Sequence, residues 1–83
     1  MNREEIKKKV FEVIRRRVID WYDGDITEEM TYHEMDCDSL DAVELMMDIE
    51  REFHISPRDA EWNDAKTIGQ WVDLVVKHLR NGR

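Results

Sequence analysis

The sequence predicts an all-α fold, a small four-helix bundle with three longer helices and a short third helix. Apolar residues recur at three- and four-residue spacing in several segments, which places them on one face of a helix. No segment alternates apolar and polar residues over the length of a strand. The 83 residues, of which 41% are hydrophobic, suffice for one small core, so we expect a single domain over residues 1–83.

The first helix is predicted over residues 3–20. Its apolar stripe consists of Ile6, Val10, Phe11, Ile14 and Val18. Lysines and arginines occupy much of the remaining helix surface. We interpret them as a solvated face rather than as a nucleic-acid or membrane site.

A long connection is expected over residues 21–38. Its DGD sequence around Gly24 is typical of a turn. It is not a calcium loop, because apolar side chains would stand where the metal needs oxygen ligands. A connection of this length inside a compact domain is usually packed. The side chains expected to anchor it are Trp21, Tyr22, Ile26, Met30, Tyr32 and Met35.

The second helix is predicted over residues 39–53, with Asp38 as its N-cap and Asp41 completing a capping box. A short third helix is expected over residues 57–62, with Ser56 as its cap and Pro57 in the first helical position. The last helix is predicted over residues 67–79. Its capping box consists of Thr67 and Gln70.

A helical wheel divides the second helix into two apolar faces. The first spans about 40° to 140° from Asp41, should face the core, and consists of Ala42, Leu45, Met46, Ile49 and Phe53. The second spans about 200° to 260° and consists of Leu40, Val43 and Met47. The acids that border it are Asp41, Glu44, Asp48 and Glu50. We interpret the second face as a docking surface for another protein; the alternative is a helix buried on two sides within its own bundle.

The charge is concentrated in the middle of the chain. Residues 1–19 carry a net charge of +4 and residues 65–83 one of +3, whereas residues 20–64 carry −14. The central acidity argues against a nucleic-acid partner, since phosphates would be repelled. It favours basic protein partners attracted over a distance. The alternative is an acidic surface that only aids solubility.

Ser39 is the candidate functional residue, at the predicted start of the second helix. A catalytic serine needs a base and oxyanion donors, and none of the three histidines stands in a recognisable triad context or at metal-ligand spacing. The neighbouring aspartates would also disfavour an alkoxide. A helix N-terminus instead favours a negative group such as a phosphate ester, so Ser39 is better suited to being modified. The alternative is a serine that only starts the helix.

Location and assembly are predicted from simpler features. Cys37 is the only cysteine, so no internal disulfide can form, and we expect a reducing, cytoplasmic environment in which it has no role. No apolar run is long enough to span a bilayer, and residues 3–18 do not resemble a signal peptide. We therefore expect no membrane insertion, and we expect a monomer.

The stretch DCDSLDAVELMMDIEREF, residues 36–53, resembles the D-S-L attachment motif and acidic recognition helix of the acyl carrier proteins. The similarity extends more loosely over the whole chain, including the KTIGQWV start of the last helix. The resemblance implies a single carrier domain whose Ser39 receives 4'-phosphopantetheine from coenzyme A through a phosphopantetheinyl transferase. The arm would carry acyl groups as thioesters for fatty-acid, polyketide or specialised lipid synthesis. Such a protein catalyses nothing itself.

The resemblance also implies roles for both faces of the second helix. The implied partners are the transferase and acyl-transferring and chain-elongating enzymes with basic docking patches. The positions implied to face them are Asp38, Leu40, Asp41, Val43, Glu44, Met47 and Glu50, and the acid fringe adds Asp48. The positions implied to line an acyl pocket are Ala42, Leu45, Met46 and Ile49.

The sequence departs from the family at several positions. Asp36 and Cys37 stand where the family commonly has a glycine and an alanine, and Trp21, Trp62 and Trp71 are bulky additions expected to narrow or reshape the acyl pocket. Two alternatives remain open. One is an unmodified acidic helical adaptor with the carrier fold. The other is an aminoacyl or peptidyl carrier, although such carriers tend to be less acidic along the second helix.

Overall fold

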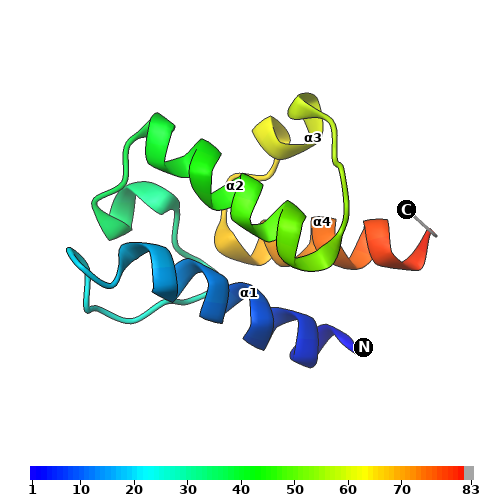
Figure 1. Cartoon of the computed structure of the whole chain (residues 1–83), viewed down its shortest axis with the longest axis horizontal. Helices are drawn as coiled ribbons and strands as arrows, with labels where there is room; N and C mark the ends of the chain where they lie inside the picture. The colour runs from blue at the N-terminus through cyan, green and yellow to red at the C-terminus, as the bar shows by residue number, and fades with distance from the viewer. Residues whose placement is uncertain (82–83) are drawn as a thin grey trace.

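The computed structural model describes residues 1–81 and has three longer helices and a short one, with no strand in that range. The longer helices are α1 (Arg3–Val18), α2 (Ser39–Phe53) and α4 (Ile68–Arg80), and the short one is α3 (Asp59–Asp64). α1 packs against both α2 and α4, and α3 packs against α4. In Figure 1, α1 and α3 lie on opposite sides of α2. The predicted all-α fold is confirmed.

α1 begins with a capping box that the sequence analysis did not identify. The Asn2 side chain accepts a hydrogen bond from the Glu5 backbone N–H at 2.9 Å, and the Glu5 carboxylate accepts one from the Asn2 N–H at 2.9 Å. These contacts satisfy donors that have no partner in the first turn of a helix. α1 ends two residues before the predicted boundary, where the Trp21 and Tyr22 N–H groups both bond the Val18 carbonyl.

α2 spans the predicted residues and has the predicted cap. The Asp41 N–H donates to the Asp38 carboxylate at 2.9 Å, and the Asp38 N–H donates to the Asp41 carboxylate at 3.1 Å. The helix ends where His54 adopts a left-handed conformation with φ 55°, so that its N–H returns to the Glu50 carbonyl. Four of the five residues predicted for the core face are buried: Ala42, Leu45, Ile49 and Phe53.

α3 begins two residues later than predicted. We expected a helix over residues 57–62 capped by Ser56, but the cap is Arg58, whose N–H donates to the Glu61 carboxylate at 2.9 Å. Pro57 is buried, and the extended backbone at Arg58 (ψ 156°) separates it from the helix. Pro57 therefore anchors the link between α2 and α3 instead of opening α3.

α4 is the most buried helix, and its predicted capping box is present. The Gln70 N–H donates to the Thr67 hydroxyl at 3.2 Å, and the Thr67 N–H donates to the Gln70 side-chain oxygen at 3.3 Å. Its buried residues are Ile68, Gly69, Trp71, Val72, Leu74, Val75 and Val76. Among residues 1–81, no helix is both long enough and apolar enough to cross a membrane.

The connection between α1 and α2 is packed onto the core, and its last part forms the 3₁₀ helix η1 (Tyr32–Met35), which was not predicted. Its side chains in or against the core are Tyr22, Ile26, Met30, Tyr32, Met35 and Cys37. Trp21 differs from the other predicted anchors. Its side chain is 44% exposed, and its Nε1–H donates to the Met35 carbonyl at 3.2 Å.

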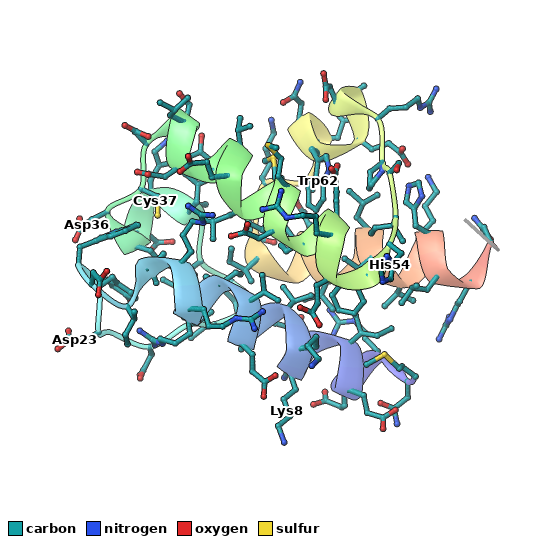
Figure 2. The ribbon with its side chains drawn as sticks, in the orientation of Figure 1. Lys8, Asp23, Asp36, Cys37, His54 and Trp62 are labelled. Atoms are coloured by element: carbon teal, nitrogen blue, oxygen red, sulfur yellow. The ribbon has the colours of Figure 1, made fainter. Side chains whose placement is uncertain are left out.

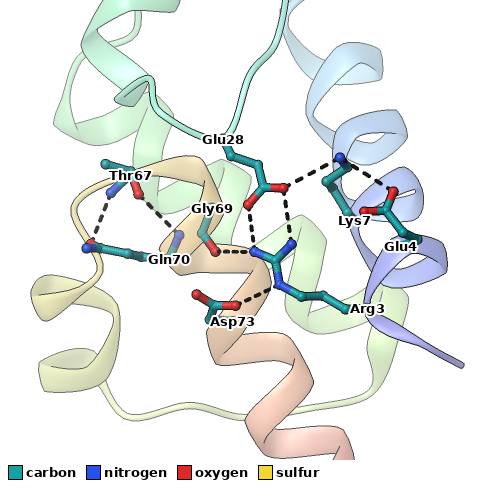
Figure 3. A network of polar contacts seen from close by, with 8 residues as sticks. All are labelled: Arg3, Glu4, Lys7, Glu28, Thr67, Gly69, Gln70 and Asp73. Carbon is teal, nitrogen blue, oxygen red and sulfur yellow. Dashed lines mark hydrogen bonds and ion pairs between the residues drawn. The ribbon is translucent and has the colours of Figure 1, made fainter.

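A polar network ties this connection to α1 and α4 (Figure 3). The Arg3 guanidinium donates to both carboxylate oxygens of Glu28, at 2.6 and 3.1 Å, and to Asp73 at 2.9 Å. The Gly69 N–H donates to the Glu28 carbonyl at 2.8 Å. Position 69 requires glycine, because a Cβ there would lie 3.1 Å from that carbonyl oxygen and closer still to the Glu28 side chain. The middle of the connection is therefore held in one place.

Candidate functional site

Ser39 is the first residue of α2, and its side chain is exposed. The turn that leads into it, around Asp36 and Cys37, lies at one end of the bundle (Figure 2). Asp38 supplies the helix cap, which leaves the Ser39 hydroxyl outside the capping box. The hydrogen bond from the Asp41 N–H holds the pKa of the Asp38 carboxyl below its usual range, so the cap stays ionised at neutral pH. Ser39 is thus accessible on an ordered helix end.

Asp36 gives the turn before Ser39 its geometry. It adopts a left-handed conformation with φ 58° and ψ 37°, and its N–H donates to the His33 carbonyl at 3.0 Å. The acyl carrier proteins, which the sequence resembles, commonly have glycine at this position. Aspartate is one of the few other residues that visit this region, because its short side chain is tolerated there. Aspartate in place of glycine at position 36 therefore preserves a sharp turn, but the backbone is more strained than it would be with glycine.

Cys37 is buried against the core next to this turn. Burial raises the pKa of its thiol, and the negative charge of Asp41 acts in the same direction. The thiol therefore stays protonated at neutral pH, and the side chain packs in the core.

The second apolar face of α2 is exposed to solvent. The side chains of Leu40, Val43 and Met47 are 71%, 49% and 47% exposed, and we call these three residues the docking strip. The alternative of a helix buried on two sides is therefore wrong. Exposed apolar side chains that follow one helix face with a polar border have the composition of a protein contact surface.

The acids between the docking strip and α1 are partly neutralised inside the molecule. Arg17 on α1 donates to Asp48 through Nε at 2.6 Å and through a terminal nitrogen at 3.1 Å, and it contacts Glu44 at 3.3 Å. Arg51 also pairs with Asp48. The hydrogen bonds from Arg17 hold the pKa of Asp48 below its usual range. Asp48 is thus a structural ion-pair partner, whereas the Glu44 side chain remains 51% exposed.

On the other border of the docking strip, the Glu50 carboxylate also has a partner inside the molecule. Its carboxylate accepts a hydrogen bond at 2.8 Å from Nε1 of Trp62 on α3. Sequence reasoning named Trp62 only as a bulky residue expected to narrow or reshape the acyl pocket, and it identified neither its hydrogen bond to Glu50 nor the pairing of Arg17 with Asp48. The opposite charges of residues 1–19 and 20–64 are a signal for Arg17, but nothing in the sequence pairs Trp62 with Glu50.

The residues predicted to line an acyl pocket fall into two groups. Ala42, Leu45 and Ile49 are buried, whereas Met46 is half-buried and lines a cavity of about 350 Å³. The other lining residues are Thr31, Tyr32, His33, Trp62, Asn63, Ala65 and Lys66. A larger open groove of about 1210 Å³ lies beside Phe11 on α1, and no residue of α2 lines it.

The aromatic and polar contacts of His33 and His78 are with residues other than Ser39. His33 stacks on Tyr32 with 4.1 Å between ring centroids, and His78 lies 3.0 Å from Glu61. His54 is at the far end of α2 from Ser39. Within residues 1–81 there is also no cluster of three or more potential metal ligands.

Comparison with known proteins connects this site to a family. A family model described as "Phosphopantetheine attachment site" matches residues 9–75. The acyl carrier protein of Porphyromonas gingivalis is 34% identical over 77 residues, which cover 92% of this chain and 97% of the relative. Those of Rubrobacter xylanophilus and Thermotoga maritima are 38% and 36% identical over 80 residues, covering 94% of this chain and 96% of each relative. The chain therefore belongs to the acyl carrier protein family, and it is a carrier of 4'-phosphopantetheine rather than a catalyst.

Proposed function

We propose that Ser39 carries the 4'-phosphopantetheine arm and that acyl groups travel on its terminal thiol as thioesters. In the loading step, the Ser39 oxygen forms a bond to the β-phosphorus of coenzyme A. The pyrophosphate bond breaks, adenosine bisphosphate leaves, and the hydroxyl proton passes to the transferase. The observation that carries this proposal is the exposed hydroxyl on the first residue of α2, in a capped helix start.

The start of α2 acts on a phosphodiester at Ser39 in two opposite ways. The helix dipole favours a negative group there. The aspartates at positions 36, 38 and 41 repel the phosphate, which keeps it exposed rather than held against the first turn. An exposed phosphate leaves the rest of the arm free to reach an enzyme or the surface of α2.

Intact mass spectrometry after incubation with coenzyme A and a broad-specificity phosphopantetheinyl transferase tests the proposal. We expect a gain of one phosphopantetheine in the native protein and no gain in Ser39→Ala. Ser56, the other serine, is exposed in the link before α3, so Ser56→Ala is a matched control that should load normally. A native protein that gains no mass, or a Ser39→Ala variant that does, would contradict the proposal.

We further propose that the docking strip and the acids beside it receive the transferase and the acyl-handling enzymes. Asp38, Asp41 and Glu44 supply the rim charge, because Asp48 is more deeply buried in its ion pair than Glu44 and Glu50 accepts the Trp62 hydrogen bond. Glu44→Lys should slow loading roughly fivefold at low salt and less at high salt, since rim charges act mainly by steering. Glu12→Lys makes the same charge change on the exposed side of α1 and should leave the loading rate unchanged. Equal slowing at every salt concentration would contradict steering.

The cargo we propose is an acyl group of fatty-acid, polyketide or specialised lipid synthesis. The curated relatives are named acyl carrier proteins, and that name supports an acyl cargo over an aminoacyl or peptidyl one. Thioester profiling of the protein isolated from its own host distinguishes these cargoes. Recovery of aminoacyl thioesters alone would favour the peptidyl-carrier alternative, and an unmodified Ser39 would favour the adaptor.

A further inference from the structure

The cavity beside Met46 opens on the same face of α2 as Ser39. Met46 follows Ser39 by seven residues, which is about 10 Å along the helix axis and within about 20° of two whole turns. The cavity lies between this part of α2, the start of η1 at Tyr32 and the end of α3 at Trp62. A group on the arm of Ser39 can therefore reach it without crossing the docking strip, which follows another side of α2.

The inner side of this cavity is closed by aromatic rings. Trp62 and Tyr32 line it, and Trp71 contacts both rings without lining the cavity itself. The Trp62 and Trp71 rings meet edge to face at 83° with 5.7 Å between centroids, and Tyr32 stacks on Trp71 at 6.4 Å. Since Trp71 is 1% exposed, it lies behind the two lining rings, toward the bundle interior.

Hydrogen bonds hold both tryptophans in position. The Trp62 Nε1–H donates to Glu50 at 2.8 Å, and the Trp71 Nε1–H donates to the Ala65 carbonyl at 3.1 Å. A chain that entered the interior, where Leu45 is fully buried, would have to displace these rings and break their hydrogen bonds. The rings therefore form a fixed inner wall.

The cavity volume limits what fits in front of this wall. Its volume of about 350 Å³ is near the lower end for small-molecule sites and roughly twice that of a cavity of about 150 Å³ that holds one benzene ring. It therefore accommodates about twelve non-hydrogen atoms. About four of these belong to the thioester and the end of the arm, which leaves room for an acyl chain of about eight carbons.

An acyl pocket beside the second helix is what the family resemblance implies. We propose that this cavity is that pocket and that Trp62, backed by Trp71, limits the cargo to chains no longer than about octanoyl. This inference rests on the proposed function, because it requires an acyl group on the arm at Ser39. Chains beyond the limit remain in solvent past the cavity mouth. The protein would then serve enzymes that make or use short and medium acyl groups.

The test is a stability series on the acylated protein. The transferase loads coenzyme A thioesters from acetyl to palmitoyl, intact mass confirms loading, and the melting temperature is compared with that of the protein carrying the bare arm. We expect the gain to rise up to octanoyl and to stay constant for longer chains. A gain that keeps rising to palmitoyl would overturn the length limit, and no gain at any length would overturn the cavity as the acyl site. Failure to load at all would overturn the proposed function as well.

Two enlarging variants locate the wall. The plateau is the chain length beyond which the gain in melting temperature stays constant. Trp62→Phe and Met46→Ala should each move this plateau to longer chains by at least one member of the series. Trp21→Phe makes the same aromatic change at an exposed position that does not line the cavity, and its plateau should stay at octanoyl. Because each gain is measured against the same variant with the bare arm, a general loss of stability cancels. A plateau unmoved in Trp62→Phe would contradict the role of this wall, and one unmoved in Met46→Ala would contradict the assignment of this cavity.

Discussion

Replacing Asp48 with asparagine tests whether this acid serves the fold rather than a partner. The change keeps the size of the side chain but removes the charge that Arg17 and Arg51 contact. Arg17 donates two hydrogen bonds to Asp48, and the two side chains are 33% and 18% exposed. Hydrogen bonds to charged groups contribute about 1.5–3 kcal/mol when buried, and exposed ion pairs about 0.2–1 kcal/mol. For this partly exposed pair we expect a loss of about 1.5 kcal/mol.

Thermal unfolding followed by circular dichroism measures this loss. In a domain of this size, 1 kcal/mol corresponds to roughly 4–8 °C, so the midpoint for Asp48→Asn should fall by about 6–12 °C. The matched control is Glu44→Gln, which removes a charge from the more exposed acid that contacts the same arginine at 3.3 Å. Its unfolding midpoint should move by no more than about 4 °C.

A double-mutant cycle with Arg17→Met isolates the pair. We expect a coupling energy of about 1 kcal/mol between positions 17 and 48, and a smaller one between positions 17 and 44. An Asp48→Asn variant with the melting temperature of the native protein would refute the reasoning. In that case Asp48 would not be needed for stability and could contribute to binding a partner, as Asp38, Asp41 and Glu44 are proposed to do.

Three other substitutions test features of the backbone and of α3. Asp36→Gly should stabilise the fold by about 0.5–1 kcal/mol in urea unfolding, because the relief of left-handed strain exceeds the greater freedom of glycine in the unfolded chain; a destabilised variant would contradict the strain. Gly69→Ala should destabilise it by about 1–3 kcal/mol, because the new Cβ meets the Glu28 backbone, and an unchanged midpoint would refute that close contact. The backbone N–H of Arg58, followed by the His78 side chain, lowers the pKa of Glu61 to about 2. This contribution is present above the ordinary glutamate pKa of about 4.3 and is lost as the pH falls through about 2. Glu61→Gln should therefore be less stable than the native protein at neutral pH, and the difference should shrink as the pH falls from about 4 through about 2, whereas a constant difference across that range would contradict the assignment.

The elements whose signals are local were predictable from the sequence. α2 and α4 begin with capping boxes whose members lie three residues apart, and both boxes form as the sequence indicated. The apolar spacing of α2 separated its core face from the docking strip for the same reason, since a helix fixes the direction of each side chain.

The features that the sequence did not reveal depend on contacts between distant residues. Ser56 and Pro57 carry a local helix-start signal, but Pro57 is buried in the link and α3 begins two residues after it. The pairing of Asp48 with Arg17 joins residues 31 positions apart, and the contact of Trp62 with Trp71 needs the folded positions of α3 and α4. Among the candidate site residues, position and exposure of Ser39 followed from its helix start, whereas the engagement of Asp48 and Glu50 required the tertiary structure.

The internal pairing of Asp48 has a consequence for how two molecules meet. Arginines shield the middle of α2, while Asp36 and Asp38, directly before Ser39, form no ion pair within residues 1–81. The negative charge is therefore uneven along α2 and is least compensated at the Ser39 end. A partner enzyme with a basic patch, as proposed above, would be attracted most strongly to that end before contact. Such attraction would orient the carrier with Ser39 toward the enzyme.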